Sequence, residues 1–137
     1  MTTYRNYTDA QYEELIILLQ LCGLYDEPWE TRENLKLKIE KDPESIILAC
    51  DGEQIIGCVF VVVDGWIGMI WRLAVVESYR KQGIGNELMH RAERLIKERG
   101  VKEASLFVGS DKRNLQDWYQ KNGYTKTTDY TFMYKEV

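Results

Sequence analysis

An abrupt change of sequence period between residues 69 and 98 constrains the fold more than any other feature. Residues 69–76 are largely apolar and partly β-branched, which is typical of a buried strand. Apolar residues then recur on one face of a helical pattern, at Ile84, Leu88, Ala92, Leu95 and Ile96. The opposite face is charged, and Gly100 supplies a helix end. A strand that leads directly into an amphipathic helix predicts a sheet with helices packed against it.

The turn between this strand and this helix has the composition of an anion-binding site. It contains two cations, Arg80 and Lys81, and two glycines, Gly83 and Gly85. The first turn of a helix exposes backbone N–H groups without partners and about half a positive charge. Glycine allows a phosphate to approach that backbone closely. The composition predicts a pyrophosphate site, but a lone Gly-x-Gly also occurs where a helix merely begins at a glycine-rich turn.

Two other phosphate-binding turns do not fit. A Walker A loop needs Gly-Lys-Ser or Gly-Lys-Thr, whereas Gly85 is followed by Asn86 and Glu87. A dinucleotide-binding turn needs a third glycine where the chain has Leu88, and it follows the first strand of a β-α-β unit. The sequence therefore indicates a different kind of pyrophosphate site.

Further strands and helices are expected on both sides of this turn. Apolar or alternating segments predict strands at residues 3–7, 46–50, 54–63, 104–108 and 125–135, the last holding one or two strands. Helical spacing predicts helices at residues 8–22, 31–41 and 115–122. The expected order is β-α-α-β-β-β-α-β-α-β-β, an α/β fold with a mixed central sheet of about six to seven strands and about four flanking helices. A length of 137 residues suits a single domain over residues 1–137.

The overall composition argues against several classes of function. The net charge of −4 does not favour binding to nucleic acid or to an anionic membrane. Three cysteines without a Cys-x-x-Cys, and one histidine, do not form the pattern of a metal site, so no metal is expected. No apolar run approaches the ~20 residues of a membrane span, and the N-terminus lacks an apolar signal segment. A cytoplasmic protein is therefore expected.

Three motifs resemble signatures of the GNAT superfamily of N-acetyltransferases. Residues 80–85 (Arg-Lys-Gln-Gly-Ile-Gly) resemble its Arg/Gln-x-x-Gly-x-Gly/Ala motif, and residues 73–75 (Leu-Ala-Val) resemble the Leu-x-Val that ends its fourth strand. Residues 118–124 resemble its C-terminal pattern of an apolar residue, Tyr, any three residues, Gly, and then Phe or Tyr. The expected order of elements also matches the family's fold. The resemblance covers nearly the whole chain and looks closest to small bacterial members.

The resemblance implies that acetyl-CoA is the acyl donor. The backbone at Leu73, Ala74 and Val75 would pair with its pantetheine arm as an added strand would. One of these N–H groups would polarise the thioester carbonyl, an effect worth ~3 kcal/mol in comparable sites. Arg80 would support the pyrophosphate. The pyrophosphate would lie against the backbone N–H groups of the next six residues, Lys81, Gln82, Gly83, Ile84, Gly85 and Asn86.

The resemblance also implies that Tyr119 protonates the departing thiolate. A phenol has a pKa near ~10 and a thiol near ~8.5, so this transfer is slightly unfavourable but feasible once a hydrogen bond has formed. The structural alternative is a core tyrosine on an amphipathic helix. The Gly123 and Tyr124 that follow favour the catalytic interpretation.

The chain departs from the family pattern at three places, of which one, residues 77–79 in place of a common proline-containing turn, is expected to be harmless. Many relatives carry an asparagine at the position of Lys112, so either Lys112 or Asn114 is expected to contact the cofactor, or the contact is missing. Some relatives place a glutamate base where this chain has Met69 and Phe107, so that base is absent. Deprotonating a lysine amine at neutral pH costs ~3 pKa units, or about 4 kcal/mol, whereas an α-amine costs only ~1 unit. The site is therefore expected to suit an amine of low pKa or to take its base from elsewhere.

The acceptor is expected to be a small molecule or peptide with an amine near the loop between the first two helices, which borders the acceptor site in this family. The candidate residues are aromatic or charged and lie in that loop and on the fourth strand: Tyr25, Glu27, Trp29, Trp71 and Arg72. Glu27 and Glu30 are candidate bases, although for each one singly an ordinary solvated loop acid is the favoured interpretation. The alternative to an enzyme is a non-catalytic acetyl-CoA sensor or regulatory module. Both a monomer and a homodimer are compatible with the sequence.

Overall fold

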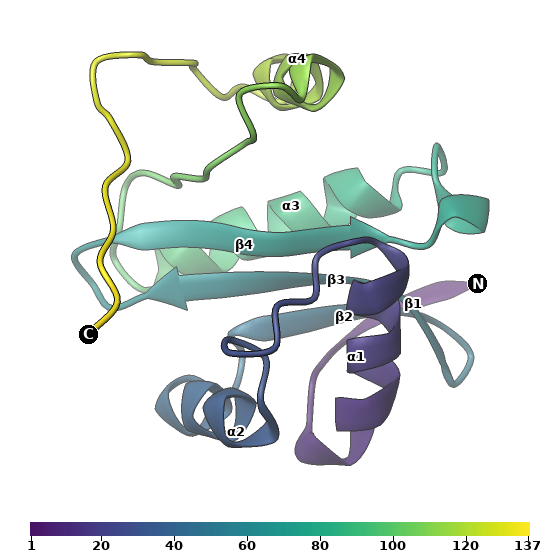
Figure 1. The fold of residues 1–137 in the computed structure, drawn as a ribbon. Helices are drawn as coiled ribbons and strands as arrows, with labels where there is room; N and C mark the ends of the chain where they lie inside the picture. Colours follow the sequence, from purple (N-terminus) through teal and green to yellow (C-terminus); the bar gives the residue numbers. More distant parts are fainter. The chain divides into compact units, whose positions relative to one another are not determined.

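An antiparallel sheet of four strands forms the framework of the first of two units in this computed structural model, which describes residues 1–137. The units are Met1–Leu106 and Phe107–Val137. The strands β1 (Thr2–Asn6), β2 (Ile46–Asp51), β3 (Gln54–Val63) and β4 (Gly68–Val75) lie side by side in that order (Figure 1). Each neighbouring pair is antiparallel, so the expected meander from the second to the fourth strand is confirmed.

Helices cover both faces of this sheet. α1 (Tyr12–Leu21) packs on one face and is followed by α2 (Arg32–Lys41), while α3 (Ile84–Glu98) packs on the other face (Figure 1). Because β3 is covered on both sides, residues 55–61 are all buried, and this strand reads as an unbroken apolar run rather than an alternating one. None of the helices is both long enough and apolar enough to cross a membrane.

The helices begin and end where their sequence signals predict. A short 3-10 helix, η1 (Asp9–Gln11), precedes α1, and the Gln11 side chain accepts a hydrogen bond from the Thr8 N–H at 3.0 Å, as expected for a capping box. The predicted apolar stripe of α3 is buried. Each of its residues is no more than 5% exposed: Ile84, Leu88, Ala92, Leu95 and Ile96. Gly100 follows α3 with a φ of +86°, a left-handed conformation that glycine adopts without a steric penalty.

The second unit contains one helix, α4 (Arg113–Lys121), between two irregular segments. The helix ends at Gly123, whose φ of +95° turns the chain so that the Tyr124 N–H donates to the Tyr119 carbonyl at 3.1 Å. Phe107 and Phe132, at opposite ends of this unit's sequence, meet edge to face with ring centroids 4.9 Å apart.

The prediction of six to seven strands in a mixed sheet is wrong, because the sheet has four strands and is antiparallel throughout. Of residues 104–108, only Ser105 pairs, through a single parallel bridge to Met69. Residues 125–135 form no strand. The sequence pattern shows that side chains suit a sheet but does not identify a partner strand. In addition, a bulge farther along β4 interrupts the edge along which a fifth strand would pair.

Candidate functional site

A β-bulge divides β4 just before the Leu-Ala-Val motif. Ala74 lies opposite Cys58 of β3 and Trp71 lies opposite Phe60, so β4 has two residues, Arg72 and Leu73, where β3 has one. Arg72 has a φ of +53°, in the left-handed region. This conformation costs a non-glycine residue about 1–2 kcal/mol, so the surrounding contacts must hold it in place.

Beyond the bulge, β4 turns unpaired backbone groups away from β3. The Val76 N–H donates to the Ile56 carbonyl of β3 at 2.9 Å. Since residues beyond the bulge alternate in direction, the Ala74 N–H faces β3 and the Val75 N–H points to the outer edge, two residues after Leu73 of the bulge. Within Met1–Leu106, that edge is paired only at its start, where the Ile70 N–H donates to the Ser105 carbonyl at 2.9 Å. The edge from Leu73 to Val75 is therefore available to a strand-like ligand.

One acceptor on this edge is already used. The Val75 carbonyl accepts a hydrogen bond from Arg80 Nε at 2.9 Å and lies 3.7 Å from Cys22 Sγ. Arg80 thus connects the end of β4 to the loop that follows it. The Val75 N–H is the outward-facing donor left on this edge for a ligand.

The loop between β4 and α3 has a backbone suited to an anion. A short 3-10 helix, η2 (Glu77–Tyr79), is anchored by the Tyr79 hydroxyl, which donates to Asp51 Oδ2 at 2.7 Å. Lys81 and Gly83 then adopt left-handed φ values of +62° and +84°. Arg80 before them is extended, with φ −70° and ψ 162°, and successive N–H groups in a turn that contains left-handed residues can form an anion-binding concavity.

The loop ends at the N-terminus of α3, where helical donors are unpaired. Gly83 is the N-cap residue and offers no side chain to cap the helix. The first helical hydrogen bond runs from the Glu87 N–H to the Gly83 carbonyl at 3.0 Å, which leaves the N–H groups of Ile84, Gly85 and Asn86 without a partner inside the helix. Ile84 is buried and fixes the helix, whereas Lys81, Gln82 and Asn86 are exposed. An exposed cluster of N–H donors with two nearby cations can hold a diphosphate.

The candidate acceptor residues lie in the loop after α1 and on β4. Tyr25 and Trp71 are partly buried and pack against the core that Leu15, Leu18 and Leu19 of α1 form with the sheet. Trp29 is 67% exposed, and Glu27 is also exposed. The loop therefore presents one aromatic residue, Trp29, and two acidic residues, Asp26 and Glu27, at the surface.

Glu30 and Arg72 form an ion pair that the sequence does not reveal. Glu30 is 3% exposed, and its Oε1 accepts a hydrogen bond from Arg72 Nε at 2.5 Å. Its Oε2 accepts from the Asp26 N–H at 2.9 Å. The carboxylate that Arg72 meets is thus one from its own chain. No local signal could have indicated the pair, since its members are 42 residues apart.

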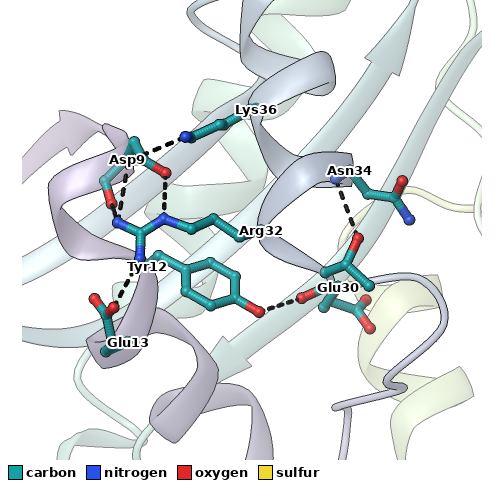
Figure 2. Close-up of polar contacts among 8 residues, drawn as sticks. Asp9, Tyr12, Glu13, Glu30, Arg32, Asn34 and Lys36 are labelled. Carbon is teal, nitrogen blue, oxygen red and sulfur yellow. Dashed lines mark hydrogen bonds and ion pairs between the residues drawn. The ribbon is translucent and has the colours of Figure 1, made fainter.

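The C-terminal end of the same loop is fixed by a separate network at the start of α2. Figure 2 shows the Tyr12 hydroxyl donating to the Glu30 carbonyl, at 2.8 Å. The Arg32 guanidinium bonds both carboxylate oxygens of Asp9 at 3.0 Å and reaches Glu13 Oε1 at 2.8 Å. The Arg32 contacts join α2 to η1 and α1, whereas the Tyr12 contact holds the backbone of Glu30, whose carboxylate is paired with Arg72 of β4.

The candidate catalytic tyrosine lies in the second unit. Tyr119 is buried on α4, with its ring edge-on to Trp118 and Tyr124 at centroid distances of 5.0 and 5.8 Å. Burial raises the pKa of Tyr119 to about 12, because the low-dielectric surroundings disfavour the phenolate. Lys112 is the N-cap residue of α4 and Asn114 lies in its first turn, and both side chains are exposed.

Two hollows in the structure are lined by residues other than the end of β4 and the loop before α3. One hollow of about 250 Å³ lies between the β3–β4 hairpin and residues 101–105, at the opposite end of β4 from the loop. A polar hollow of about 320 Å³ lies within the second unit, along α4. No three His, Cys, Asp or Glu side chains lie together as a metal ion would need.

Known proteins resemble the chain in both sequence and fold. An acetyltransferase of Sodalis glossinidius is 30% identical over 121 residues, which cover 88% of this chain and 84% of that protein. The PaiA N-acetyltransferase of Thermoplasma acidophilum, solved in complex with coenzyme A, is 22% identical with a TM-score of 0.76, over 91% of this chain and 90% of that one. Ard1 of Thermoplasma volcanium is 21% identical with a TM-score of 0.79, over 92% and 84%.

A sequence model of the acetyltransferase (GNAT) family matches residues 10–124, a span that includes the bulge, the loop and α4. The resemblance seen in the three motifs is therefore confirmed by comparisons over most of the chain. The chain belongs to the GNAT family of acetyltransferases.

Proposed function

We propose that this protein transfers the acetyl group of acetyl-CoA to a primary amine by direct attack in a ternary complex. The observation that carries the proposal is the junction of β4 and α3. There, an outward-facing strand edge adjoins an exposed, left-handed loop at a helix N-terminus. These two features suit the two parts of coenzyme A, an amide-containing arm and a diphosphate. The complex of the PaiA N-acetyltransferase with coenzyme A supports the choice of ligand.

In this proposal the donor lies along the edge and the loop. The pantetheine amides pair with the backbone at Leu73, Ala74 and Val75, and one N–H polarises the thioester carbonyl. The pyrophosphate accepts hydrogen bonds from the backbone of residues 81–86. Arg80, which is tied to the Val75 carbonyl, fixes the loop relative to the strand and adds positive charge. Lys112 or Asn114 contributes a further contact from the second unit.

The chemical step is a displacement at the thioester carbonyl. The amine nitrogen bonds to the carbonyl carbon, the carbon–sulfur bond breaks, and Tyr119 donates its proton to the sulfur, to be reprotonated from solvent. Because burial raises the pKa of Tyr119 to about 12, the residue is protonated at every pH at which the protein works. The same shift makes it a weaker acid, so donation must follow formation of the hydrogen bond to sulfur.

The proton lost by the amine needs a separate acceptor. Glu30 is a poor candidate because both of its oxygens accept internal hydrogen bonds and its charge is paired with Arg72. Glu27 is exposed in the same loop and is the better of the two. Since the chain has Met69 and Phe107 where some relatives place a glutamate base, the site best suits an amine of low pKa, such as the α-amine of a peptide or amino acid. A single catalytic domain acting in the cytoplasm completes the proposal.

Release of free coenzyme A, followed with a thiol-trapping reagent across a panel of amines and peptides, tests this function. Turnover with at least one amine, faster for α-amines than for lysine side chains, is expected. The missing glutamates at Met69 and Phe107 favour one alternative, a non-catalytic acetyl-CoA sensor. Tight binding of acetyl-CoA with no coenzyme A release for any amine would establish that alternative. Absence of binding would overturn both.

A further inference from the structure

Glu30 is the only charged residue that is buried. The other buried side chains are that of Ser45 and those of apolar and aromatic residues. A carboxylate is kept in such a position only when hydrogen bonds and an opposite charge compensate for lost hydration. Glu30 has both, since Asp26 N–H and Arg72 Nε each donate to one of its oxygens. Its own backbone carbonyl is held as well, by the Tyr12 hydroxyl (Figure 2). The residue is therefore fixed from three sides.

The partner of Glu30 is the residue that carries the bulge. Arg72 has the left-handed φ of +53°, and its side chain is 20% exposed. Its carbonyl accepts a hydrogen bond from the buried Cys58 thiol at 3.3 Å. Side chain and backbone of Arg72 are thus both constrained, and the next residue, Leu73, begins the outward-facing edge. The Arg72 side chain is therefore anchored one peptide unit before that edge.

We propose that Glu30 is a positioning residue for donor binding, which it controls through Arg72. Its carboxylate holds the arginine, the arginine holds the bulge, and the bulge sets the edge that follows it, where the Val75 N–H points outward. The pair also joins the loop at residues 22–31 to the strand. The acceptor side and the donor side are therefore coupled, and a ligand on either will alter affinity for the other. This inference rests on the proposed function, because it assigns coenzyme A to the edge.

A second ion pair in the same loop provides a matched control. Arg32, the first residue of α2, bonds Asp9 and Glu13 and lies over the Tyr12 ring at 5.3 Å (Figure 2). Arg32→Gln removes charged pairs that anchor the end of the same loop but keeps both hydrogen bonds of the Glu30 carboxylate. A role of Glu30 in general stability would make the two variants alike, whereas positioning of the bulge would separate them.

The informative variant is Glu30→Gln, which keeps the shape but loses the charge. One of its two terminal atoms becomes an amide nitrogen, which accepts no hydrogen bond. The glutamine side chain therefore cannot accept from both the Asp26 N–H and Arg72 Nε. Titration calorimetry with coenzyme A, at a temperature where circular dichroism shows each variant folded, reports donor affinity without an acceptor. Amide hydrogen exchange at Ala74 and Val76, which face β3, reports whether the bulge has loosened.

Coenzyme A is expected to bind Glu30→Gln at least about fivefold more weakly, at the low end of coupling between linked sites. Exchange at Ala74 and Val76 is expected to quicken while α3 stays protected, and Arg32→Gln should change neither reading. Should Glu30→Gln not fold, Glu30→Asp, which retains the charge on a shorter side chain, gives the same comparison.

Wild-type affinity and wild-type exchange in folded Glu30→Gln would overturn the inference, as would an equal loss in Arg32→Gln. Failure of the wild-type protein to bind coenzyme A would instead overturn the proposed function. The exchange measurement would still decide in that case whether Glu30 holds the bulge.

Discussion

At the residue scale, Gly85 gives the sharpest test of the anion loop. It lies in the first turn of α3, where its N–H has no partner in the helix. Gly85→Asp places a carboxylate against the proposed pyrophosphate, and we expect coenzyme A affinity to fall by about 100-fold or more, as for a charge opposed at a desolvated contact. Gly85→Asn has nearly the same shape without the charge, so its loss of affinity in calorimetry should be much smaller. Equal losses in the two variants would show that bulk, rather than charge, blocks the site.

Tyr119 is the residue on which the chemical step depends. Tyr119→Phe is expected to lower turnover by about 100-fold, the lower range for a general acid, while coenzyme A affinity stays unchanged. A purely structural role would instead lower thermal stability and affinity together. Steady-state kinetics and calorimetry on the same preparations separate the two effects.

The pH dependence of turnover gives an independent reading of Tyr119. Burial raises its pKa to about 12, so the proton it donates is present throughout the range below that value. Turnover of the wild-type protein should therefore rise with pH as the amine acceptor deprotonates, and it should show no alkaline decline up to about pH 10. A decline centred below pH 10 would mean that another group supplies the proton.

At the element scale, local signals predicted most of the first unit and, in the second, the helix but not the strands. The strand predicted at residues 54–63 has those bounds, and the helix predicted to start at Ile84 does start there, because period and caps are local properties. The bulge at Arg72 and the pair with Glu30 depend on residues distant in sequence, so no local pattern revealed them. The strands predicted at residues 125–135 are absent for the same reason, because a strand needs a partner strand that lies elsewhere in the sequence.

Close approach between β3 and β4 predicts a sensitive position at Gly57. A Cβ there would lie 2.9 Å from the Ala74 carbonyl oxygen and 3.3 Å from Leu88 Cδ1. Gly57→Ala should therefore force the strands apart and lower the free energy of unfolding by about 1–3 kcal/mol, as overpacking does. Gly23→Ala is the control. A Cβ at Gly23 would have no neighbouring atom within 4 Å, so this variant carries only the strain of a φ of +69°. Chemical denaturation should show the larger loss for Gly57→Ala, and the reverse order would contradict the close approach.

At the scale of the whole molecule, the net charge of the protein has the same sign as the charge of its proposed ligand. The chain carries −4 at neutral pH and the proposed donor is a polyanion, so the global field does not favour the complex. Affinity must come from local donors, namely the N–H groups of residues 81–86 and the cations Arg80 and Lys81. Binding should consequently depend on the diphosphate more than on the rest of the ligand.

Thermal unfolding with a series of ligands tests that dependence. A ligand at 100 times its dissociation constant stabilises the folded state by about 2.7 kcal/mol, or about 5–10 °C for a chain of this size. Coenzyme A should produce such a shift, whereas pantetheine, which has the arm but no diphosphate, should produce almost none at the same concentration. Gly85→Asp should abolish the shift with coenzyme A and leave the unliganded transition nearly unchanged, since the position is partly exposed. An equal shift with pantetheine would place the binding energy on the strand edge alone, and the loop at residues 80–86 would lose its assigned role.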